Sequence, residues 1–132
     1  MRAQPDGFKQ KALGRTAEDA AAQFLASQGY KVVGRNVRPL PALARGELDI
    51  VAWDGDILCF IEVKARTSTR GPDPDISVSE SKRNQLMTLA LAYMSVNQIE
   101  PESCRFDVVS VWISPALPSP QLVLHKDAFE AS

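Results

Sequence analysis

An uninterrupted apolar run inside a predicted hairpin constrains this fold most. Residues 47–53 and 57–65 both have strand patterns, and Asp54-Gly55 between them is a strong hairpin turn signal. Residues 57–61 read Ile-Leu-Cys-Phe-Ile, which is apolar on both faces of a strand. Such strands usually lie in the middle of a sheet and are covered on both sides. The rest of the chain must therefore supply neighbouring strands and two covering layers.

The remaining segments supply these elements. Apolar residues at spacings of three and four predict an alanine-rich helix over residues 13–28, which Gly29 ends. A second helix is expected over residues 77–96, with Ser77 to Glu80 forming a capping box. Further strands and loops complete the order; the strands are expected over residues 30–33, 105–113 and 121–125, and the loops over 36–45 and 67–76.

This order predicts an α/β fold with a mixed β-sheet flanked by α-helices. The long connection through the second helix suits a right-handed parallel crossover, and the strand over residues 121–125 is expected at an edge. A length of 132 residues corresponds to one domain. We expect residues 1–11 to form a flexible basic N-terminal arm and residues 12–132 to form the domain.

The composition excludes several classes of protein. Two cysteines and one histidine exclude a disulfide scaffold, a four-cysteine zinc site and any metal motif that needs two histidines. The polar N-terminus lacks the apolar core of a signal peptide, and no stretch approaches the ~20 apolar residues of a membrane span. We therefore expect a cytoplasmic protein that does not contact a membrane.

The charges are distributed unevenly along the chain. Residues 1–45 hold eight Lys and Arg against three Asp and Glu, whereas residues 46–132 hold seven against thirteen. A cationic first part could face a polyanion such as nucleic acid. On charge alone, an unevenly charged solvated surface is the simpler interpretation.

Carboxylates interrupt both hairpin strands at the ends away from the turn. If Asp54-Gly55 is a two-residue loop, Asp49 lies opposite Phe60 and Glu47 lies opposite Glu62. Asp49 is then the diagonal neighbour of Glu62, with backbones roughly 7–8 Å apart. A four-residue loop would keep these side chains on one face, whereas a three-residue loop would reverse the parity and separate them.

This arrangement of acids favours metal chemistry. Lys64 shares the face of Glu62, because strand side chains alternate. Clustered carboxylates repel one another, and a divalent cation such as Mg²⁺ or Mn²⁺ removes that cost. The ion would lower the pKa of a bound water, and Lys64 could position that water or neutralise charge at phosphorus. The combination predicts metal-dependent phosphodiester hydrolysis; the alternative is a half-exposed hairpin with surface salt bridges between Lys64 and Glu47 or Glu62.

The same residues carry a resemblance to known proteins. Asp49 followed by Glu62-Val63-Lys64 resembles the D…(D/E)-x-K core of the restriction-endonuclease-like nucleases. More narrowly, the chain resembles the YraN-like family of bacterial proteins, which are often labelled as endonucleases. The segments that carry this resemblance are residues 14–21, 29–36, 46–52, 60–66 and 105–109, together with Lys82.

The resemblance implies a restriction-endonuclease-like fold and assigns roles to four residues. Asp49 and Glu62 match the metal-binding carboxylates, and Lys64 matches the lysine of the motif. Glu18 matches a helical glutamate that joins the catalytic site from the first helix in the related archaeal junction resolvases. From the residues alone, Glu18 is equally well explained as an acid near a helix N-terminus.

Other polar residues could assist such a site. Glu47 is expected to have an auxiliary role, and Lys82 and Gln85, one helical turn apart, could reach the cleft or a phosphate. Arg66 and Arg70 could clamp a backbone phosphate, because arginine suits that geometry. The alternatives are a solvated helix start for the first pair and a mobile surface loop for the arginines.

These observations predict a Mg²⁺- or Mn²⁺-dependent endonuclease that acts on nucleic acid, DNA in the first instance. No sequence-reading element is evident, so selectivity for branched or single-stranded structures is expected. The chain could also be a nucleic-acid-binding module without turnover, or a protein that docks a protein partner through residues 114–132. A homodimer would supply the two sites needed to cut two strands together.

Overall fold

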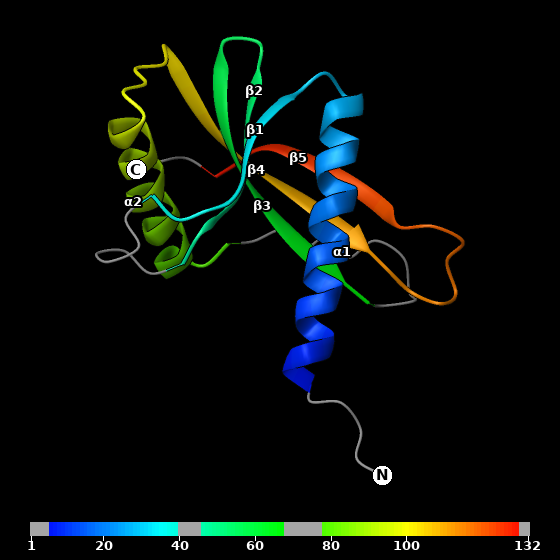
Figure 1. Ribbon diagram of the computed structural model, residues 1–132. Coiled ribbons are helices and arrows are strands. Elements are labelled where there is room, and N and C mark those ends of the chain that lie inside the picture. Colours follow the sequence, from blue (N-terminus) through cyan, green and yellow to red (C-terminus); the bar gives the residue numbers. More distant parts are fainter. Residues whose placement is uncertain (1–5, 40–45, 68–77, 130–132) are drawn as a thin grey trace.

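The computed structural model describes the backbone of residues 6–39, 46–67 and 78–129, and side chains from residue 12 onward. Figure 1 shows the elements in these ranges around one twisted sheet. They are α1 (Asp6–Ser27), β1 (Lys31–Val37), β2 (Leu48–Asp54), β3 (Ile57–Arg66), α2 (Glu80–Val96), β4 (Ser103–Trp112) and β5 (Gln121–Phe129).

The sheet is mixed, which confirms the predicted α/β class. The strand order is β1-β2-β3-β4-β5, so the apolar β3 lies in the centre and β5 lies at an edge. Neighbouring strands are antiparallel except for β3 and β4, which are parallel and joined through α2. This parallel pair aligns Glu62 with Val108 and Lys64 with Ser110. The polar end of β3 is therefore supported by β4.

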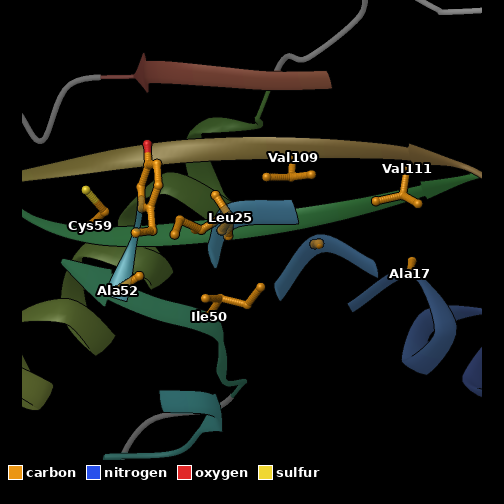
Figure 2. Close-up of a cluster of buried hydrophobic side chains, with 10 residues drawn as sticks. Ala17, Leu25, Ile50, Ala52, Cys59, Val109 and Val111 are labelled. Atoms are coloured by element: carbon orange, nitrogen blue, oxygen red, sulfur yellow. The ribbon is translucent and has the colours of Figure 1, made fainter. Parts of the chain in front are cut away.

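Each face of the sheet is covered by one helix (Figure 1). Figure 2 shows the α1 side of the core, where Leu25 lies close to the sheet residues. The buried side chains of this cluster come from α1, the segment after it and three strands: Ala17, Ala21, Leu25, Tyr30, Ile50, Ala52, Cys59, Ile61, Val109 and Val111. Ala17, Ala21 and Leu25, which are four residues apart, thus face the sheet, as the sequence pattern predicts.

Aromatic rings fill the core under α2. The ring of Phe60 meets Tyr93 edge-on at 6.1 Å between centroids and lies 5.7 Å from Phe106. Phe106 stacks on Phe129 at 4.8 Å. This last contact explains why β5 continues to Phe129, four residues beyond the predicted strand.

Two helix starts differ from the prediction. α1 begins at Asp6 instead of residue 13, so residues 6–11 of the predicted flexible arm are helical. Residues 9–12 are Lys, Gln, Lys and Ala, which favour helix. The helix therefore continues toward the N-terminus beyond the residues with the apolar pattern. The N-cap of α2 is Ser79, whose Oγ accepts a hydrogen bond from the Lys82 N–H at 3.1 Å. The predicted cap, Ser77, lies outside the described residues.

A buried ion-pair network holds the end of the sheet near the β2–β3 turn. Asp107 is fully buried, and its carboxylate accepts hydrogen bonds from Arg105 at 2.8 Å, Tyr30 Oη at 3.0 Å and the Asp127 N–H at 2.9 Å. Arg105 also donates to Asp54 Oδ2 at 2.8 Å. The network joins the chain after α1 to β2, β4 and β5. Burial and the charge of Asp107 both raise the pKa of Tyr30.

Neither helix in the described ranges is both long enough and apolar enough to span a membrane.

Candidate active site

The β2–β3 turn differs from the predicted turn by one position. Trp53 pairs with Leu58 and Asp54 with Ile57, so the two-residue loop is Gly55-Asp56. Gly55 has a φ of 61°, which suits the first position of a type II′ turn. Asp54 remains in the strand because Arg105 holds its carboxylate.

The shifted turn gives β2 and β3 a different register from the predicted one. Their pairing reaches Ile50 opposite Ile61, the residues next to Asp49 and Glu62. The side chains of Asp49 and Glu62 are hydrogen-bonded to each other, so the two acids are closer than the predicted diagonal pair. Asp49 Oδ2 also accepts a hydrogen bond from the Val63 N–H at 2.9 Å, which fixes the side chain beside β3.

The two carboxyl groups share a site where one of them holds a proton. The Glu62 side chain is 14% exposed. Burial, then the charge of Asp49 and a hydrogen bond to its side chain, raise the pKa of Glu62 to about 8, although the charges of Lys82 and Lys64 act in the opposite direction. A neighbouring negative charge disfavours the charged form of a carboxyl group. With a pKa of about 8, Glu62 keeps its proton at neutral pH.

Glu18 and Glu47 join this pair from α1 and from the start of β2. Glu18 is half-buried, and burial followed by the charges of Asp49 and Glu47 raises its pKa. With its amide nitrogen turned toward the two acids, Asn36 donates to Glu18 Oε2 at 2.6 Å and to Glu47 Oε1 at 3.2 Å. The predicted residues Glu18, Glu47, Asp49 and Glu62 therefore gather at one end of the sheet.

A second contact fixes α1 next to these acids. Arg35, the neighbour of Asn36, forms an ion pair with Asp19 at 2.6 Å. Two consecutive residues of β1 thus contact Glu18 and Asp19, two consecutive residues of α1. A cavity of about 400 Å³ opens here, lined by Gly14, Arg15, Glu18, Asn36 and Glu47. Glu18 and Glu47 accordingly border an accessible space.

The basic side chains approach from the α2 side. Lys82 Nζ lies 3.7 Å from Glu62 Oε2. Lys64 follows Glu62 by two residues on β3, and its charge lowers the pKa of Glu62. Gln85 packs against Gly46, where a Cβ would lie 2.6 Å from Gln85 Nε2. Gly46, with a φ of 82°, therefore lets the first turns of α2 approach the start of β2.

The predicted arginines follow Lys64 in the sequence. Arg66 ends β3 in register with Trp112, and its carbonyl accepts a hydrogen bond from the Ile113 N–H at 2.9 Å. It lies two residues beyond Lys64 along the strand. Arg70 lies outside the described residues. The structure thus brings Lys64 and Lys82 close to Glu62 and places Gln85 beside Gly46, the residue before Glu47.

The chain matches the model of the uncharacterised protein family UPF0102 over residues 17–111. This chain belongs to the UPF0102 family. The predicted YraN-like resemblance is thereby confirmed at the level of the family. The matched region runs from α1 to β4 and contains every candidate acid and lysine named above.

UPF0102 proteins of several bacteria align with most of this chain. A relative from Symbiobacterium thermophilum is 42% identical over 78% of this chain and 84% of its own length. A relative from Solibacter usitatus is 41% identical over 88% of this chain and 84% of its own length. One from Moorella thermoacetica is 45% identical over 76% of this chain and 80% of its own. The similarity therefore covers most of each protein.

The donor set in this UPF0102 protein suits a hydrated divalent cation. In the described ranges, no three Asp, Glu, His or Cys side chains are arranged as a complete metal-binding set. Mg²⁺ is commonly held by one or two carboxylates, with water and substrate oxygens as its other ligands. Asp49 and Glu62 supply such a pair, and a cation there would relieve the repulsion that raises the pKa of Glu62.

Asn36 is the member of the cluster that the sequence analysis did not single out. Its φ of 51° is left-handed, a conformation that asparagine adopts more readily than most residues. The signal available in the sequence was an asparagine at the start of the predicted loop over residues 36–45, within a segment that carries the family resemblance. Its two carboxylate partners come from elements distant in sequence, so their convergence was visible only in the fold.

The raised pKa of Glu62 predicts how stability depends on pH. The folded protein keeps a proton on this carboxyl that the unfolded chain loses above its ordinary pKa of 4.5. Without a metal ion, this group therefore lowers stability progressively as pH rises from about 4.5 to about 8. Glu62→Gln should remove this effect and be more stable than the native protein at pH 8.5 by about 1–3 kcal/mol.

Urea unfolding at pH 5 and pH 8.5, in the presence of EDTA, measures this difference. The control is Glu100→Gln, which changes an exposed glutamate beyond the end of α2. This control should follow the native protein at both pH values. Equal pH dependence in Glu62→Gln and the native protein would contradict the assignment of the proton to the Asp49–Glu62 pair.

Proposed function

We propose that this protein is an endonuclease that hydrolyses phosphodiester bonds with the help of Mg²⁺ or Mn²⁺. The observation that carries the proposal is the hydrogen bond between the side chains of Asp49 and Glu62, with the pKa of Glu62 raised to about 8. A carboxylate pair with a strongly perturbed pKa, beside lysines and a third acid, is typical of a catalytic site. The spacing of Asp49, Glu62 and Lys64 matches the nuclease motif that the sequence resembles.

Asp49 and Glu62 would hold the metal ion. When bound, the ion would supply a water of lowered pKa and would withdraw charge from a phosphoryl oxygen. The hydrogen bond from the Val63 N–H keeps Asp49 in place for this role. Glu62 must lose its proton before it can bind the ion, so occupancy should increase with pH.

The surrounding side chains suit the other parts of the reaction. Lys64 carries a positive charge next to Glu62, where it can hold the attacking water or neutralise charge that develops at phosphorus. Glu18 has a raised pKa and is suited to accept a proton from that water at a carboxylate oxygen. Asn36 positions Glu18 through its side-chain hydrogen bond.

We propose nucleic acid, and DNA in particular, as the substrate, with the activity in the cytoplasm. α1 and α2 pack on the two faces of the sheet, and the first turns of α1 extend beyond it (Figure 1). The sequence contains no evident base-reading element, so selectivity for branched or single-stranded structure is favoured over selectivity for sequence.

A cleavage assay tests the function. Single-stranded, flapped, four-way-junction and linear duplex DNA are incubated with the protein in Mg²⁺, in Mn²⁺ and in EDTA. We expect cleavage of at least one branched or single-stranded substrate, dependent on the metal ion and lost in Glu62→Gln but retained in Glu100→Gln. Equal cleavage by the native protein and Glu62→Gln would contradict the proposal, and so would the absence of cleavage of all four substrates.

A further inference from the structure

The candidate site has two electrostatically different sides. Glu18 of α1 and Glu47 at the start of β2 lie on one side of the central pair and share the amide of Asn36. On the other side, Lys82 of α2 faces Glu62, and Lys64 lies close enough for its charge to lower the pKa of Glu62. Arg15 and Arg35 lie near Glu18, but the cations that act on the central pair, Lys64 and Lys82, lie on the second side. A polyanion bound at the central pair is therefore attracted from the second side.

Lys82 is held in position by its helix, while its ammonium group remains accessible. Ser79 caps α2 and accepts the Lys82 N–H at 3.1 Å. One turn later, Gln85 packs against Gly46 of the chain that leads into β2. The Lys82 side chain is 39% exposed, against 14% for the Glu62 side chain that it contacts. The lysine thus lies at the solvent side of the pair.

The contact between Lys82 and Glu62 is loose. At 3.7 Å between Nζ and Oε2, it is an ion pair without the short distance of a charge-assisted hydrogen bond. Its attraction depends on the negative charge of the Asp49–Glu62 pair. A cation bound by that pair would offset this charge and leave the Lys82 ammonium group available to a substrate oxygen.

We propose that Lys82 forms the phosphate-binding side of the site, so that the DNA backbone passes over the start of α2. Lys82 contacts Glu62 when no metal ion is bound, and it contacts a substrate phosphate once a divalent cation occupies the carboxylate pair. This inference rests on the proposed function and adds to it the direction from which the substrate approaches.

DNA binding as a function of salt tests the assignment without requiring turnover. The probe is a fluorescently labelled single-stranded DNA, titrated in Ca²⁺ and, separately, in EDTA. The variant is Lys82→Met, which removes the charge and keeps an unbranched side chain. The matched control is Arg83→Met, which removes a positive charge from the next residue of the same helix, where the side chain is exposed.

In Ca²⁺, Lys82→Met should weaken binding about fivefold near 0.1 M salt and reduce the slope of log K against log salt by about 0.7, the value for one single-strand phosphate contact. Arg83→Met should stay within about twofold of the native protein, since non-contacting surface charges are largely screened. In EDTA, Lys82→Met should weaken DNA binding much less, because without a metal ion the native Lys82 stays paired with Glu62 and does not contact the DNA.

The possible failures are distinguishable. Equal losses in Lys82→Met and Arg83→Met would show a diffuse charge effect and overturn the proposal. An undiminished loss for Lys82→Met in EDTA would overturn the exchange between Glu62 and phosphate. If the native protein binds no DNA in Ca²⁺, the proposed function fails, and this inference fails with it.

Discussion

Asp49→Asn is expected to reduce metal-dependent cleavage about a thousandfold, which corresponds to about 4 kcal/mol of transition-state stabilisation. Asparagine keeps the shape of the side chain and an oxygen that can accept the Val63 N–H, so the local strand structure should survive. What is lost is one of the two negative charges that would hold the metal ion. Initial rates of DNA cleavage at saturating Mg²⁺ measure the effect.

The matched control is Asp56→Asn, at an exposed position in the β2–β3 turn of the same hairpin. It should cleave at the native rate. Asp49→Asn should also lower the pKa of Glu62, because the charge of Asp49 is a main cause of its elevation after burial. A variant that retains more than about a tenth of native activity, with its fold intact by circular dichroism, would contradict the assignment of Asp49 as a metal ligand.

Asp107→Ala is expected to destabilise the fold by about 3–5 kcal/mol, the cost of breaking a buried ion pair by removing one partner. The substitution removes the buried acceptor that Arg105, Tyr30 Oη and the Asp127 N–H share. A small domain has only 5–15 kcal/mol of stability in total, so much of the population could unfold. Urea unfolding at pH 7 provides the measurement.

Because Asp107→Ala could fail to fold, Tyr30→Phe provides a milder test of the same network. It removes one hydrogen bond and should cost about 1 kcal/mol. Both variants leave the carboxylates of the candidate site in place, at the other end of β2 and β3. A loss below 1 kcal/mol for Asp107→Ala would show that the network does not stabilise the sheet as its burial suggests.

Local patterns in the sequence were sufficient to predict most of the fold. The fully apolar run of β3 identified the central strand, and the long connection through α2 identified the parallel pair. Boundaries that depend on tertiary contacts were wrong. β5 is longer because Phe129 stacks on Phe106, and the turn is displaced because Arg105 holds Asp54 in β2. The sequence pattern contained neither contact.

The candidate site was predictable where it lies on one hairpin. The strand pattern predicted that Asp49 and Glu62 lie close together across the hairpin, and their side chains do interact although the turn is displaced by one position. The contribution of Glu18 was implied by family resemblance, since a helix remote in sequence cannot be oriented from its own pattern. Asn36 was missed because its role depends on a left-handed backbone and on two partners from α1 and β2.

Calorimetric titration of Mn²⁺ into the protein at pH 7 tests the central claim most directly. Repeating the titration in two buffers of different ionisation enthalpy gives the number of protons released with each metal ion. Binding of one ion per chain should release close to one proton, because Glu62 must lose the proton that its raised pKa retains. Glu62→Gln should abolish this binding. Absence of binding, or equally tight binding by Glu62→Gln, would contradict the assignment of Asp49 and Glu62 as a metal site.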